Sequence, residues 1–186
     1  MKFFNDLFFC LNKPKVIIIT GKNKGITKTA VFEVLKSHFK LGKEILIFEA
    51  GAEDKEKIKF LVNNSSFPIL LTDEVAIAKI LPEKGCVIFN SDEENNHLLK
   101  NEILASIFSF GSGEGADLFV SDIVANGETN FKINYLGSSV PVWLSGKLDK
   151  EKIYAVLAAI ACGIKLKLNL VQISQALKSL KDIDKS

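Results

Sequence analysis

The sequence predicts an α/β protein with three layers, in which helices cover both faces of a mostly parallel sheet of the phosphate-loop type. Short apolar, β-branched runs alternate with segments of helical periodicity as far as residue 110, a pattern typical of parallel strands joined by helices. The first run, residues 16–20, leads into Gly21 and a polar helical stretch. Further on, Asn126-Gly127 and Gly137-Ser138 are hairpin signals, and they predict a small antiparallel ribbon over residues 117–144.

The elements follow from these patterns in chain order. We predict parallel strands at residues 16–20, 44–48, 67–72, 86–90 and 106–110, and ribbon strands at 117–125, 130–136 and 140–144. The first helix follows the glycine loop and is expected to end near Leu41 and Gly42. Further helices are predicted at residues 54–62, 76–81, 97–105 and 150–162, and a last one is capped by Asn169.

The chain of 186 residues is long enough for one well-buried domain, which we place at residues 15–186. Residues 1–14 are rich in Phe but too short and poorly flanked for a signal peptide. We expect them to form a docking segment, with a membrane-surface anchor as the alternative. No apolar run approaches the roughly 20 residues that cross a bilayer, so we expect a cytoplasmic protein without a transmembrane segment.

The charge pattern narrows the possible partners. All 24 cationic side chains are Lys, and 22 acidic side chains nearly balance their charge. The lysines are spread along the chain, so no basic tract indicates binding to nucleic acid. Without Arg, the chain cannot supply an arginine finger to a phosphate. The three cysteines, Cys10, Cys86 and Cys162, stand apart in apolar stretches and are expected to be buried thiols. The two histidines, His38 and His97, have no partner at the spacing of a metal site.

The glycine loop is the first candidate site. A strand that leads through glycine into a helix start aims backbone N–H groups at an anion, so we expect phosphate binding at Gly21, Lys22, Asn23, Lys24, Gly25, Thr27 and Lys28. The usual loop ends in Gly-Lys-Ser/Thr, where Lys reaches the outer phosphates and the hydroxyl binds Mg²⁺. Here the short form of that motif places Gly25 at the Lys position and Ile26 at the hydroxyl position. An alternative is a plain strand-to-helix connection with solvated lysines.

Lys28 lies one helical turn beyond Gly25 and could reach back to the phosphate position. Thr29 has a side chain too short to cover the rise of about 4.5 Å over three residues. Other polar groups follow the predicted strands, where open α/β sheets bind ligands. Glu49 could hold a metal ion or a water, or it could cap the following turn, and Asn90 and Asp92 form either ligand contacts or a turn.

With these elements in order, the chain resembles the central domain of the Mur ligase family, most closely its MurF-like branch. Residues 16–29 are similar to the family's strand and T-G-x-N-G-K-T-T loop, and residues 48–51 to its E-x-G motif. Residues 87–92 resemble its V-x-N-x-D segment, and residues 109–111 its x-F-G strand end. Residues 144–146 and 155–160 resemble its L-x-G-x-H-N-x-x-N-A-x-A-A element. The resemblance covers nearly the whole chain.

The resemblance implies ATP and Mg²⁺ as cofactors in forming an acyl phosphate that an amine attacks, a peptide ligase reaction of peptidoglycan biosynthesis. It implies Glu49 as the magnesium carboxylate and Lys79 as a match for a lysine that is carbamylated in the family. The family's loop Lys and hydroxyl become Gly25 and Ile26, and its base-binding His and two Asn become Leu148, Asp149 and Ala155. A His-bearing stretch and the two flanking domains are expected to be absent.

These changes favour a degenerate ligase core that acts as a binding or scaffolding subunit, with a complete ligase or cell-wall enzyme as its partner. The alternatives are a ligase component completed in trans, in which Lys28 or Lys24 replaces the missing lysine, and a nucleotide sensor. No catalytic residue is assigned beyond the candidates Lys28 and Lys79.

Overall fold

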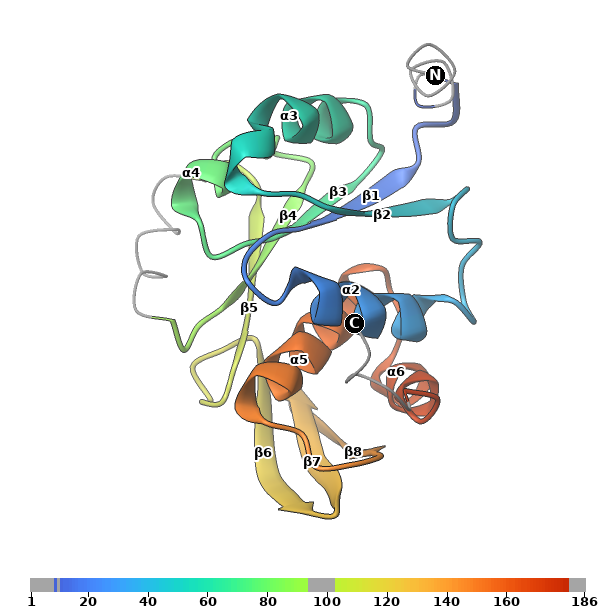
Figure 1. The fold of residues 1–186 in the computed structure, drawn as a ribbon, viewed down its shortest axis with the longest axis vertical. Helices are drawn as coiled ribbons and strands as arrows, with labels where there is room; N and C mark the ends of the chain where they lie inside the picture. The colour runs from blue at the N-terminus through green and yellow to red at the C-terminus, as the bar shows by residue number, and fades with distance from the viewer. Residues whose placement is uncertain (1–8, 10, 94–102, 181–186) are drawn as a thin grey trace.

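The computed structural model describes residue 9, residues 11–93 and residues 103–180. Within them the chain forms three layers, with one sheet between two groups of helices (Figure 1). The helices α3 (Lys55–Asn63) and α4 (Val75–Ala78) cover one face, and α2 (Lys24–Leu35), α5 (Lys150–Lys165) and α6 (Leu170–Leu177) cover the other. The predicted fold class is confirmed. None of the helices in the described part is long and apolar enough to cross a bilayer.

The sheet has eight strands in the order β2-β1-β3-β4-β5-β6-β7-β8. Its parallel part comprises β1 (Lys15–Ile19), β2 (Ile45–Glu49), β3 (Pro68–Leu71), β4 (Cys86–Asn90) and β5 (Ser106–Gly111), close to the predicted strands. In β1, β3 and β4 nearly every side chain is buried, because helices cover both faces. Two apolar cores result, one between the sheet and α2, α5 and α6, the other on the side of α3 and α4.

The order of strands reverses at β1. The chain runs from β1 through α2 to β2 on one side, and then through α3 to β3 on the other side of β1. The loops after β1 and β3 therefore diverge to opposite faces of the sheet and leave a crevice at the carboxyl ends of these strands. Open α/β sheets bind ligands at such a reversal point.

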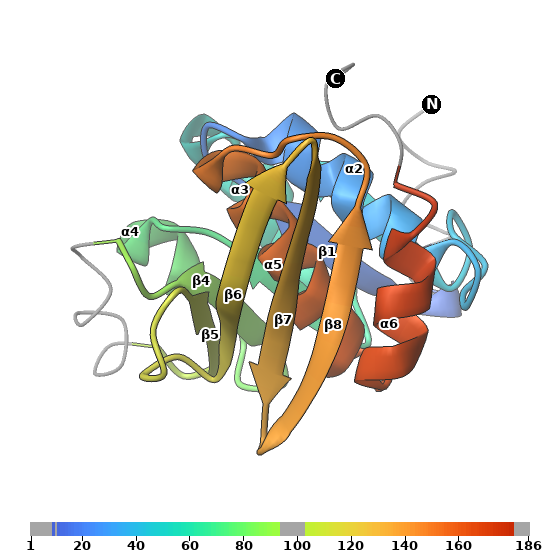
Figure 2. The ribbon, with the colours of Figure 1, turned by 90° about the horizontal axis from the view of Figure 1, so that it is seen from below.

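The antiparallel ribbon consists of β6 (Leu118–Asn126), β7 (Glu128–Tyr135) and β8 (Ser138–Leu144), as the two hairpin signals predict (Figure 2). It extends the main sheet, because the start of β6 pairs in parallel with the end of β5 at Phe110 and Gly111. No crossover helix is needed, since β6 continues past the end of β5. The inward ribbon face packs on α5 through β6 and on α6 through β8.

Some predicted boundaries were wrong. Helix α2 ends at Leu35 and not near Leu41 and Gly42. Phe39 still packs against the core from the following turn, so an apolar position at helical spacing extended the prediction beyond the helix. Helix α4 is a single turn, because Pro82 follows soon after. Residues 97–102 of the predicted 97–105 helix lie outside the described residues, and residues 103–105 are not helical.

The remaining predictions concern isolated side chains. Phe9, within the predicted docking segment, is buried, with its ring centroid 5.7 Å from that of Phe60 and 6.4 Å from that of Phe48. Cys86 and Cys162 are buried free thiols, and burial raises the pKa of each. His38 lies in the turn after α2. Cys10 and His97 lie outside the described residues.

Candidate functional site

The loop between β1 and α2 turns at Gly21. Its φ of +91° lies in the left-handed region, which glycine adopts without the strain that a side chain brings. This turn places the start of α2, at Lys24, above the carboxyl end of the sheet. The predicted strand-to-helix corner is therefore present, with its helix N-terminus beside the crevice.

Two threonines join the strand ends at the reversal point. The Thr20 hydroxyl lies 2.8 Å from Thr72 Oγ1 and 3.2 Å from the Leu71 carbonyl oxygen. The Glu74 backbone N–H donates to Thr72 Oγ1 at 3.1 Å. Both hydroxyls are buried, so these bonds fix the floor of the crevice where β1 and β3 separate.

Above this floor is a cavity of about 510 Å³. On one side it is lined by the corner residues Gly21, Lys22, Asn23 and Thr27, and on the other by α5. On the α5 side the lining residues are Lys150, Glu151, Tyr154, Ala155 and Ala158. The cavity is large enough for a small organic ligand, with polar groups at the corner and both polar and apolar side chains on the α5 side.

Acidic side chains face the corner within this cavity. Asp73 and Glu93 line it, and a Cβ atom at Gly21 would lie 3.6 Å from Asp73 Oδ2. Burial raises the pKa of the Asp73 carboxyl, and the nearby charges of Glu93 and Glu74 raise it further. The cations Lys22 and Lys150 also line the cavity, so the site carries charges of both signs.

Tyr154 of α5 connects this helix to the loop after β4. The sequence patterns did not single it out. Its hydroxyl donates to Asp92 Oδ2 at 2.7 Å, and the Ser112 N–H donates to the same oxygen at 2.8 Å. Burial works against ionisation of Asp92, but these hydrogen bonds outweigh it and lower its pKa. The one sequence signal for Tyr154 was its position as a polar aromatic residue in an otherwise alanine-rich helix. Asn90 lines the cavity, while Asp92 accepts the hydrogen bond from Tyr154.

The predicted phosphate and metal residues Lys28 and Glu49 contact each other. Lys28 Nζ lies 2.9 Å from Glu49 Oε1, and the two side chains are 47% and 33% exposed. In the described residues no group of three acidic, His or Cys side chains gathers to hold a metal. Mg²⁺ requires several oxygen ligands in near-octahedral geometry, and an ammonium group already occupies the Glu49 oxygen. With Lys28 in this position, the pair does not fit a Mg²⁺ ion bound at Glu49 Oε1.

The first turn of α2 carries the other predicted loop residues. Ile26 packs against the core, and the Thr29 hydroxyl donates to the Gly25 carbonyl oxygen at 3.1 Å. Lys24 and Gly25 belong to this turn but are not among the cavity-lining residues. Lys79 follows α4 on the opposite face of the sheet and also lies outside the lining.

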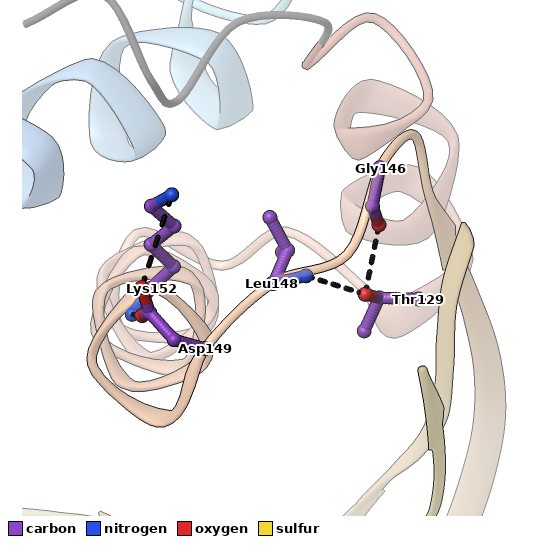
Figure 3. Close-up of polar contacts among 5 residues, drawn as sticks. All are labelled: Thr129, Gly146, Leu148, Asp149 and Lys152. Atoms are coloured by element: carbon purple, nitrogen blue, oxygen red, sulfur yellow. Dashed lines mark hydrogen bonds and ion pairs between the residues drawn. The ribbon is translucent and has the colours of Figure 1, made fainter. Parts of the chain in front are cut away.

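The residues between β8 and α5 make contacts that stabilise the fold. The buried Thr129 accepts a hydrogen bond from the Leu148 N–H at 2.8 Å and donates to the Gly146 carbonyl at 2.9 Å (Figure 3). Leu148 is buried in the core, and the Asp149 side chain caps α5 by accepting from the Lys152 N–H. Side chains at these positions therefore support the ribbon and the helix start.

Comparison with known proteins shows which family has this sequence and fold. No protein-family model matches the chain. A UDP-N-acetylmuramate–L-alanine ligase of Persephonella marina is 30% identical over 133 residues, which is 71% of this chain. The structure matches a UDP-N-acetylmuramoylalanyl-D-glutamyl-2,6-diaminopimelate–D-alanyl-D-alanyl ligase of Acinetobacter baumannii with a TM-score of 0.76 over 94% of the chain, at 16% identity. The chain belongs to the Mur ligase family.

Further Mur ligases share the fold. The MurF ligase of Thermotoga maritima, whose structure is a complex with ADP, matches with a TM-score of 0.70 over 88% of the chain at 17% identity. The chain spans 48% of each of these two solved ligases and 28% of the Persephonella sequence. The matched part is the central portion of the Mur ligases, as the resemblance implied.

Proposed function

We propose that this Mur ligase core binds a nucleoside phosphate in the cavity at the strand ends and does not carry out ligation. Binding is supported by the corner at Gly21, by the cavity beside it and by the ADP in the matched MurF of Thermotoga maritima. In this role the chain is a binding subunit, and a complete ligase or another cell-wall enzyme is its expected partner.

The observation that carries the proposal is the first turn of α2. At the positions where the short phosphate-loop motif has Lys and a Mg²⁺-binding hydroxyl, this chain has Gly25 and Ile26. Ile26 packs against the core, and its side chain has no atom that could bind a metal or a phosphate. The corner still has the backbone N–H groups of a strand-to-helix turn, which can bind a phosphate. It lacks the loop Lys and the metal-binding hydroxyl, which would neutralise the charge formed during acyl phosphate synthesis.

A ligase component completed in trans is less well supported. It requires Lys28 or Lys24 to serve the phosphates while Glu49 holds a metal. The ion pair between Lys28 and Glu49 engages both groups with each other, which favours the non-ligating role.

Thermal unfolding with ADP or ATP tests the proposal. Ligand at 100 times its Kd stabilises a folded protein by about 2.7 kcal/mol, so we expect a clear rise in Tm at millimolar nucleotide and no phosphate release from ATP. The absence of a shift would contradict nucleotide binding, and phosphate release with Mg²⁺ would contradict the loss of chemistry.

A charge reversal tests the place of binding. Lys22→Glu changes an exposed cavity residue and should weaken ADP about tenfold, or about 1.4 kcal/mol. Lys43→Glu makes the same change at an exposed turn outside the cavity lining and should leave the ADP affinity near that of the wild type. Equal effects of the two variants would mean that the loss reflects net charge alone.

A further inference from the structure

Lys28 and Glu49 come from separate elements that meet at the carboxyl edge of the sheet. Lys28 lies in the second turn of α2, and Glu49 is the last residue of β2. Helix α2 packs against β1 and β2, which brings the Lys28 ammonium within 2.9 Å of Glu49 Oε1. Both side chains are partly exposed, so dissolved Mg²⁺ can reach the pair and compete with it.

Mg²⁺ would find few ligands beside Glu49. It is usually held by one or two carboxylates together with substrate phosphates. In the part of the chain that the structure describes, Glu49 belongs to no group of three or more acidic, His or Cys side chains that could hold a metal ion. The side chain of Ile26, at the position of the motif's metal-binding hydroxyl, is apolar and packs against the core. The family implies a magnesium site here, and these residues disagree with it.

An ammonium group supplies part of what the metal would supply. It carries one positive charge and three N–H donors, and the pair with Glu49 engages one of these donors. Unlike a metal ion, it cannot polarise a phosphate oxygen as a Lewis acid. It can hold an anion but contributes little to bond formation, which agrees with binding without ligation.

Lys28 directly follows the lining residue Thr27 on α2, and neither Lys28 nor Glu49 itself lines the cavity. We propose that Lys28 is a built-in substitute for the divalent cation at Glu49, so that a nucleoside diphosphate whose phosphates lie at the neighbouring Gly21 corner binds without Mg²⁺. This inference rests on the proposed nucleotide binding and specifies how that site is regulated. The affinity of the wild-type protein for nucleotide does not depend on divalent cations, whereas removal of the Lys28 charge opens Glu49 to Mg²⁺.

The experiment measures ADP affinity by calorimetry in EDTA and in excess MgCl₂, for the wild type and three variants. The wild type should bind ADP with nearly equal Kd in both conditions. Lys28→Met should lose affinity in EDTA and recover at least about tenfold when Mg²⁺ is added. The double variant Lys28→Met/Glu49→Gln should lose that recovery, because the carboxylate is gone.

Lys24→Met is the matched control. It removes the same charge from the same helix, four residues earlier, but leaves the pair of Lys28 and Glu49 intact. We expect it to weaken ADP equally in EDTA and in MgCl₂. A Mg²⁺ response equal to that of Lys28→Met would overturn the inference, because the effect would then follow net charge and not the place of the ammonium.

The remaining outcomes distinguish failure of this inference from failure of the proposed nucleotide binding. Tenfold tighter ADP binding by the wild type in MgCl₂ would overturn the inference and leave the proposed nucleotide binding standing. If the wild type binds no ADP while Lys28→Met binds it with Mg²⁺, the proposed function fails and the inference is overturned with it, because Lys28 then excludes the metal without replacing it. If no protein binds ADP in either condition, both are overturned.

Discussion

Thr129 is fully buried, and its hydroxyl contacts two backbone groups of the segment that connects β8 to α5. Gly146 is exposed, so water can replace its bond, whereas the buried bond to the Leu148 N–H has no such replacement. Single polar contacts of this kind fix the start of α5, which forms one wall of the cavity.

Thr129→Val should therefore lower the free energy of unfolding by about 1–3 kcal/mol, the cost of leaving a buried N–H group unpaired. Urea denaturation measures this change. Thr129→Ser retains the hydroxyl and loses one methyl group, which costs about 0.8 kcal/mol. Because Val retains the methyl group of Thr and lacks only the hydroxyl, a Val variant as stable as the wild type would contradict a stabilising role of the hydroxyl contacts.

Asp73 gives the site a pH dependence. Its folded-state pKa is raised above the ordinary value of 3.8, mainly by burial. The stability that Asp73 contributes is therefore fully present below pH 3.8 and is lost as the pH rises through the folded-state pKa. Asp73→Asn should raise the free energy of unfolding relative to the wild type at neutral pH, and by less at pH values below 3.8.

Chemical denaturation across this pH range checks the prediction, with Glu83→Gln as a control at an exposed position. A difference between Asp73→Asn and the wild type that is the same at all pH values would contradict a raised pKa for Asp73.

At the scale of elements, helix ends follow local chemistry. Asn169 caps α6 by accepting from the Gln172 N–H, and the Gln172 side chain accepts from the Asn169 N–H. Asn169→Ala removes the cap and should cost about 0.5–2 kcal/mol. Asn169→Ser preserves an acceptor and should retain most of the stability, as measured by thermal unfolding. Equal losses in the two variants would show that the cap does not stabilise α6.

Most elements could be predicted because their signals lie within a few residues. The apolar run before Gly21, the hairpin glycines and the cap at Asn169 each specify a local conformation. The end of α2 could not be predicted in this way. Phe39 has the spacing of a helical core residue, but it packs against the core from outside the helix.

At the scale of the whole molecule, the strand order brings together residues that no local pattern connects. The reversal at β1 joins the loop of Gly21 to the loop of Asp73, which is 52 positions later by residue number. Lys28 and Glu49 were predicted as separate phosphate and metal residues because sequence carries no information on their separation. Tyr154 was missed for the same reason, since its partner Asp92 lies 62 residues away.

The fold agrees with the Mur ligases, and we propose that the chemistry at the Gly21 corner differs from theirs. A Mur ligase core that binds nucleotide without ligation should preserve the strand-end cavity and the backbone of the loop, and both are present. It should lack the groups that neutralise charge in the reaction, and Gly25 and Ile26 occupy their positions.

A crystal structure of the protein grown with ADP and Mg²⁺ tests the central claim most directly. The account predicts the diphosphate of ADP beside Gly21, Lys22 and Asn23, with Lys28 still paired to Glu49 and no metal bound at that carboxylate. A Mg²⁺ ion coordinated by Glu49 and the phosphates, with the Lys28 ammonium displaced, would contradict it.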